Sequence, residues 1–162
     1  MEAPKKITPR GLADYFEVLT KAVFQSGISW RVVEAKWPGF GRALHGFDLA
    51  AVARLRPGDV DRLLEDSGII RNRRKLEATI DNAVELLALE KEYGSFKRYL
   101  RSHGGFEETV TDLRRRFRFL GDLGAYYFLY VVGEKVPSHE EWKASRAREP
   151  RTRKGSRATP AH

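Results

Sequence analysis

The chain has 162 residues, which is long enough for one well-packed domain and short for two. It has no cysteine, which excludes disulfides and thiolate metal sites, and its four scattered histidines are a poor basis for structural zinc, so we expect neither a metal nor a cofactor. No apolar run approaches the roughly 18 residues of a membrane span, and the N-terminus lacks the apolar stretch of a signal peptide, so we expect a cytoplasmic protein.

The net charge of +8 is concentrated at the C-terminal end. Residues 143–162 contain seven Lys or Arg against Glu149 alone, and so carry six of the eight net charges. Because residues 144–162 have no large apolar side chain, they cannot offset the entropy of folding. We therefore expect one domain over 1–143 and a disordered basic tail over 144–162. Such a tail suits a polyanion, whose neutralised phosphates release counterions, or serves only solubility.

Helix signals recur through the first hundred residues. Capping residues, prolines and glycines predict helices in this order: Thr8 to Gly27, Ser29 to Pro38, Asp48 to Leu55, Pro57 to Ser67, Asn72 to Tyr93, and Ser95 to Leu100. Along the long helix, the residues expected to face inward are Leu76, Ile80, Ala83, Val84 and Leu87.

The C-terminal third predicts a helix, a glycine hairpin and a second helix. A basic helix after Gly105 leads through the hairpin at 119–124 into an apolar helix that Gly133 ends. Ser138 and Glu141 then form a capping box for a last helix. No segment alternates between apolar and polar residues for long, so we expect an all-α protein without strands.

The hairpin is a candidate phosphate site. Glycines allow backbone N–H groups to approach a phosphate, and the following helix presents the positive end of its dipole there. The basic residues before it, Arg114, Arg115, Arg116 and Arg118, favour DNA as the partner. Two other interpretations stay open, because such a turn also allows tight helix packing and charged runs are often solvated faces. Asp122 would repel a phosphate and can instead cap the following helix.

An apolar residue lies at the predicted turn between the first two helices. Ile28 follows Gly27, and Trp30 begins the next helix. Ile28 could fill the gap that an extruded base leaves in a duplex, and Trp30 could stack on that base. Alternatively, both side chains pack in the core, as buried aromatic residues usually do.

Several segments, in order along the chain, resemble the signatures of the 3-methyladenine DNA glycosylase I family. They are Tyr15-Phe16-Glu17-Val18-Leu19 with Gln25-Ser26-Gly27-Ile28-Ser29-Trp30, Phe47-Asp48 with Val52-Ala53, Asp66-Ser67-Gly68-Ile69-Ile70-Arg71-Asn72-Arg73 with Lys75, Asn82-Ala83, and Phe117-Arg118-Phe119-Leu120-Gly121 with Tyr126. The resemblance runs from about Asp14 to His139, most of the chain that we expect to fold.

This resemblance implies a compact helix-hairpin-helix fold that binds double-stranded DNA, flips an alkylated base and hydrolyses its N-glycosidic bond in base-excision repair. It implies the following positions: Gly27 and Ile28 as the wedge; Trp30, Ala22 and Phe24 around the base; and Gly121, Leu123, Gly124 and Arg118 at the DNA backbone. An alkylated purine is cationic and a good leaving group, so aromatic rings can recognise it with little acid–base help. We expect a monomer associated with the nucleoid.

The sequence also departs from the family pattern. Ala22 stands where the family has a base-contacting glutamate, and Ser138 where the wider superfamily places a catalytic aspartate. The family's N-terminal segment, with a pocket tyrosine and two zinc ligands, has no counterpart, and no cysteine follows His139, which aligns with another ligand. We therefore assign no catalytic residue. Two further functions stay open: a non-catalytic protein that recognises damaged or distorted duplex DNA, and a protein-interaction module.

Overall fold

The computed structural model describes residues 4–147, and over this range the chain is helical without strands. The helices are α1 (Leu12–Gln25), α2 (Trp30–Ala43), the short 3-10 helix η1 (His45–Phe47), α3 (Leu49–Ala53), α4 (Pro57–Leu63), α5 (Arg73–Tyr93), α6 (Phe96–Leu100), α7 (Phe106–Arg116), α8 (Asp122–Val131) and α9 (His139–Ala147). The all-α prediction is confirmed. No helix in this range is long and apolar enough to cross a bilayer.

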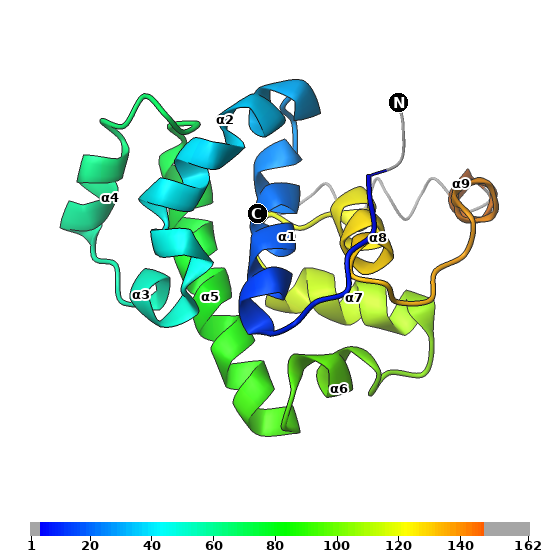
Figure 1. Ribbon diagram of the computed structural model, residues 1–162. Helices are drawn as coiled ribbons and strands as arrows, with labels where there is room; N and C mark the ends of the chain where they lie inside the picture. The colour runs from blue at the N-terminus through cyan, green and yellow to red at the C-terminus, as the bar shows by residue number, and fades with distance from the viewer. Residues whose placement is uncertain (1–3, 148–162) are drawn as a thin grey trace, which may run out of the picture.

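Helices α1 and α5 form the centre of the molecule. They pack against each other, with α3 and α4 on one side of them and α7, α8 and α9 on the other (Figure 1). The core between them is built from side chains with almost no exposed surface, among them Phe16, Leu19, Val23, Leu76, Ala83 and Leu86. Burial of such apolar surface is the main term that stabilises the fold.

Predicted capping residues begin four of these helices. The caps are Ser29, Asp48, Asn72 and Ser95, whose side chains accept hydrogen bonds from the N–H groups of Arg31, Ala51, Lys75 and Arg98 over 3.0 to 3.2 Å. The capping box of Ser138 and Glu141 is also confirmed, with N–H to oxygen distances of 3.1 and 3.2 Å. Local side-chain chemistry therefore determines where much of the helical structure starts.

Helix α2 runs through Pro38, so the prediction that this proline ends the helix is wrong. The next turn is held by packing: Phe40 is fully buried, and Gly39 lies directly against the backbone of Gly68. A Cβ at Gly39 would lie 2.1 Å from the Gly68 carbonyl oxygen. This burial outweighs the helical hydrogen bond that proline cannot donate.

The inward face of α5 differs from the prediction at two positions. Val84 and Leu87 are 50% and 36% exposed, so they were wrongly placed in the core, whereas Leu86 and Leu89 are buried. The apolar stripe is hard to recognise because polar side chains share the buried face: Lys75, Thr79 and Asn82 are each at most 5% exposed.

Other helix ends also differ from the predictions. Helix α1 begins at Leu12 after Gly11 and not at Thr8, and α4 ends at Leu63. Gly121, not Asp122, occupies the cap position of α8. Helix α9 extends to Ala147, four residues into the segment where we expect disorder, and the rest of the predicted tail, residues 148–162, lies outside the described residues.

Candidate nucleic-acid interface

The turn between α1 and α2 carries an apolar residue at the surface. Gly27 has φ of +76°, a conformation that L side chains rarely adopt, and no atom lies near the place where a Cβ would be. Ile28 follows it, is partly buried and rests against the edge of the core. The two residues predicted as a wedge therefore form a constrained turn at the surface.

Lys75 of α5 stabilises this turn through hydrogen bonds. Its side chain is 5% exposed, and its ammonium donates to the carbonyl oxygens of Phe24, at 3.3 Å, and of Ser26. These carbonyls lie at the C-terminal end of α1, where a cation also interacts favourably with the helix dipole. Burial lowers the pKa of the Lys75 ammonium from its ordinary value. The position of the wedge turn thus depends on a buried lysine from a distant part of the chain.

Asn82, two turns further along α5, stabilises the hairpin through hydrogen bonds to its backbone. Its side chain is 2% exposed and brackets the backbone of Arg118: the Arg118 N–H donates to Oδ1 over 2.9 Å, and Nδ2 donates to the Arg118 carbonyl over 3.2 Å. The next residue, Phe119, has φ of +59°, which is rare for a residue with a side chain. Asn82 therefore stabilises a hairpin whose backbone is strained.

One face of α5 consequently positions both candidate DNA contacts. Lys75 and Asn82 are seven residues apart, which places them on the same side of the helix about 10 Å apart along its axis. The wedge turn and the hairpin lie in segments nearly a hundred residues apart in sequence, yet both are hydrogen-bonded to this one rigid element.

The two hairpin glycines have different surroundings. A Cβ at Gly121 would meet no atom within 4 Å, so its backbone is open to solvent at the start of α8. A Cβ at Gly124 would lie 3.1 Å from a Leu120 methyl and 3.8 Å from the Ala22 Cβ. The tight contact is therefore with Leu120 of the hairpin itself, and Gly124 faces Ala22 of α1 across an ordinary van der Waals distance.

The arginines before the hairpin are engaged in ion pairs. Arg114 contacts Asp122 at 2.8 Å, Arg118 contacts Asp81, and Arg115 and Arg116 both contact Asp112. Asp112 also accepts hydrogen bonds from Tyr99, at 2.7 Å, and from His103, at 3.1 Å. Burial would raise the pKa of Asp112, but these donors outweigh it and hold the pKa well below its usual range.

These pairs change the interpretation of the basic helix. Arg115 and Arg116 belong to a network that joins α7 to α6 through Tyr99 and to α5 through Glu85, which Arg116 contacts at 3.0 Å. Arg114 and Arg118 are about half exposed, and surface ion pairs contribute at most about 1 kcal/mol, so a phosphate can replace their carboxylate partners at little cost.

The remaining predicted site residues fall into two groups. Trp30, in the first turn of α2, is 39% exposed, and Leu123, in the first turn of α8, is 53% exposed. Both are accessible to a ligand. Phe24 is fully buried, with its ring 4.6 Å from that of Phe40, so its position favours a role in the core over contact with a base.

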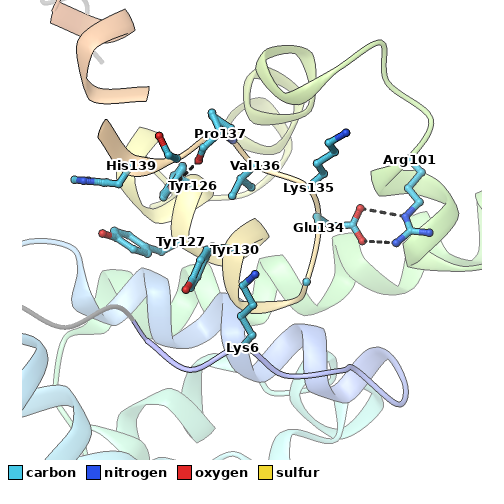
Figure 2. Close-up of a pocket in the computed structure, with 12 residues that line it drawn as sticks. Lys6, Arg101, Tyr126, Tyr127, Tyr130, Glu134, Lys135, Val136, Pro137 and His139 are labelled. Atoms are coloured by element: carbon cyan, nitrogen blue, oxygen red, sulfur yellow. Dashed lines mark hydrogen bonds and ion pairs between the residues drawn. The ribbon is translucent and has the colours of Figure 1, made fainter. Parts of the chain in front are cut away.

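An open groove of about 790 Å³ lies between α8, the loop that follows it and the start of α9 (Figure 2). Tyr127 and Tyr130 of α8 and His139 of α9 supply aromatic rings to it, and Lys6 and Lys135 supply positive charge. Its carboxylate, Glu134, bonds to Arg101 through both oxygens, at 3.1 and 3.2 Å. Sequence reasoning considered His139 but missed the two tyrosines, which stand in an unbroken apolar run.

The residues around His139 do not fit zinc. Its ring is surrounded by those of Tyr126, Tyr127 and Trp142, with centroids 5.8 to 6.0 Å away. Among residues 4–147, no three His, Cys, Asp or Glu side chains are placed to hold a metal ion.

Sequence reasoning also missed the roles of Lys75 and Asn82. Both belong to the segments that carry the family resemblance, and both are polar residues on the inward side of a long helix. A polar residue that interrupts an apolar stripe is the signal that could have identified them, because buried polar groups require partners.

Comparison with known proteins gives consistent results. A model of the methyladenine glycosylase family matches residues 9–116. The chain is 32% identical over 139 residues to the DNA-3-methyladenine glycosylase of Haemophilus influenzae, covering 73% of this chain and 75% of that protein. It is 30% identical to DNA-3-methyladenine glycosylase 1 of Escherichia coli over 73% and 74%. A solved structure of 3-methyladenine DNA glycosylase I from Staphylococcus aureus superimposes with a TM-score of 0.70 at 25% identity, covering 80% of each chain.

Proposed function

Because the chain belongs to the methyladenine glycosylase family, we propose that it excises 3-methyladenine or a similarly alkylated base from double-stranded DNA. The reaction is hydrolysis of the N-glycosidic bond, the first step of base-excision repair. The observation that carries this proposal is the family match over residues 9–116, which includes both the wedge turn and Lys75, the α5 residue that bonds to it. We further propose that the protein acts as a monomer on nucleoid DNA in the cytoplasm.

The wedge turn and the hairpin are the two elements that contact DNA. Ile28 is apolar and lies at a surface turn, so it can enter the stack and occupy the space of an extruded base. The open backbone at Gly121, with the first N–H groups of α8, can bind a phosphate next to that site. Because α5 holds both elements, their spacing is fixed before DNA binds, which lowers the ordering cost of binding.

Recognition of the base relies on aromatic rings. Trp30 is exposed beside the wedge and can stack on the flipped base, with Ala22 at the junction of α1 and α8. A purine alkylated at a ring nitrogen carries positive charge, which an aromatic face attracts and an undamaged base lacks. The same charge makes the base a good leaving group, so little help from an acid is needed.

Two substitutions test the proposed DNA contacts. Ile28→Ala removes the wedge, and Gly121→Asp places a carboxylate at the phosphate site. Each should weaken binding to an abasic-site duplex roughly tenfold and slow release of 3-methyladenine from methylated DNA, because the base is then extruded less readily. Val84→Ala, on the exposed outer face of α5, is the matched control and should change neither. Unchanged binding in both test variants would contradict this assignment of the contacts.

A second candidate function is recognition of damaged DNA without catalysis, and Ala22 is the observation that favours it. The side chain of Ala22 cannot provide the carboxylate that the family resemblance implies at this position. Ala22→Glu distinguishes the two functions if wild-type protein binds alkylated duplexes without releasing a base. Gain of base release in the variant would then show that wild-type protein is a binding protein whose pocket lacks one group.

A further inference from the structure

Helix α8 presents aromatic rings that the core does not require. Tyr126, Phe128 and Leu129 are buried, whereas Tyr127 and Tyr130 are partly exposed and line the groove together with the exposed His139 (Figure 2). The Tyr127 ring centroid lies 6.4 Å from that of Tyr130 and 6.0 Å from that of His139, and the planes of Tyr127 and His139 differ by only 29°. The planes of the two tyrosines differ by 82°, so a base that stacks on one ring would meet the other at its edge.

The charges around these rings favour a nucleotide. The Lys6 ammonium lies over the Tyr130 ring, 4.8 Å from its centre, so a base that stacks on this face displaces the ammonium toward the phosphate of its own nucleotide. Lys6 and Lys135 make the groove positive, and Glu134 is already neutralised by Arg101. Aromatic faces together with positive charge suit a ligand that combines a planar ring with a phosphate.

The two tyrosines lie on the same helix as Gly121, the proposed phosphate contact. Tyr127 and Tyr130 are six and nine residues after Gly121 on the same helix, which places them about 9 and 14 Å from its start along the axis. The helix that presents its N-terminus to the DNA backbone therefore also carries the rings. A Cβ at Gly124 would lie 3.8 Å from that of Ala22, and Tyr127 follows Gly124 by three residues, so Tyr127 lies near the side of α8 that meets the predicted base pocket.

We propose that Tyr127 and Tyr130 form the stacking surface on which this protein holds the extruded alkylated base, with His139 at its edge. This role rests on the proposed function and deepens it, because it assigns base recognition to residues on α8 in addition to Trp30. The rings act through stacking, so the role requires the aromatic ring and not the phenol hydroxyl.

Two duplexes that differ only at one nucleotide test the role of the rings. The first carries 7-methylguanine on a 2′-fluorinated sugar, a cationic purine whose glycosidic bond resists hydrolysis, and the second carries an abasic analogue at the same position. The ratio of the two dissociation constants measures what the base contributes. Tyr127→Leu and Tyr130→Leu should each reduce the preference for the base-bearing duplex roughly fivefold or more, because stacking on a base is lost. Tyr130→Phe should keep the preference within about twofold, because it retains the ring.

The control variant is Tyr93→Leu, which removes another partly buried tyrosine that packs on Tyr99 outside the groove. It should leave the ratio unchanged, and all variants should bind the abasic duplex as wild type does. A wild-type preference that survives both leucine substitutions would overturn the role of the rings while leaving the proposed function intact. Equal loss of affinity for both duplexes would overturn it as well, because the tyrosines would then be structural. A wild-type protein that neither prefers the base-bearing duplex nor releases 3-methyladenine would overturn both proposals.

Discussion

Replacing Asn82 with alanine tests the claim that α5 positions the hairpin. The substitution removes two hydrogen bonds to the Arg118 backbone, of 2.9 and 3.2 Å, from a side chain that is 2% exposed. Each such bond contributes about 0.5 to 1.5 kcal/mol net, so the free energy of unfolding should fall by about 1 to 3 kcal/mol. For a chain of this size, that loss lowers the melting temperature by roughly 2 to 10 °C.

The same substitution should weaken DNA binding through the hairpin. If the hairpin is no longer ordered before binding, DNA must order it. The free energy of ordering, about 1 kcal/mol, weakens binding and raises the dissociation constant for an abasic-site duplex roughly fivefold. Calorimetry and fluorescence anisotropy measure the two effects. Ser95→Ala is the control, because it loses a cap of similar value at the start of α6 and should leave DNA affinity unchanged. An Asn82→Ala protein with wild-type stability and affinity would refute this role for Asn82.

Two further predictions concern stability. Gly39→Ala should lower the free energy of unfolding, measured with urea, by about 1 to 3 kcal/mol or more, because the new Cβ would lie 2.1 Å from the Gly68 carbonyl oxygen. Gly41→Ala on the same helix is the control: its Cβ meets open space, so it should be neutral or stabilising by up to about 1 kcal/mol. Because hydrogen bonds hold the pKa of Asp112 below its usual range, its stabilising effect is present above an unfolded-state pKa of about 4 and is lost as the pH falls below that value. Unfolding free energies of wild-type protein should therefore decline below about pH 4 more steeply than those of Asp112→Asn, and parallel curves would contradict this.

Local chemistry in the sequence predicted much of the fold. Caps at Ser29, Asp48, Asn72 and Ser95 begin helices as expected, because each depends on contacts within three residues. The prediction failed where the deciding contact is distant in sequence. Helix α2 continues past Pro38 because Gly39 packs on Gly68, a contact between segments that no local pattern connects.

The candidate site was predicted less completely than the fold. The resemblance identified Ile28, Trp30 and Gly121, and the structure places all three at the surface. It did not indicate that Gly124 packs on Ala22, or that Arg118 pairs with Asp81, because these contacts depend on how α8 and α5 approach their neighbours. The groove tyrosines were missed for the same reason, since an apolar run alone does not show which of its residues face outward.

Release of 3-methyladenine from methylated duplex DNA by the purified full chain tests the central claim most directly. We predict release well above that of a protein-free control and a reduction of roughly tenfold or more in Trp30→Ala, because that variant loses a ring that stacks on the flipped base. Tight binding to an abasic-site duplex without any release of a base would contradict the claim that this chain is a glycosylase.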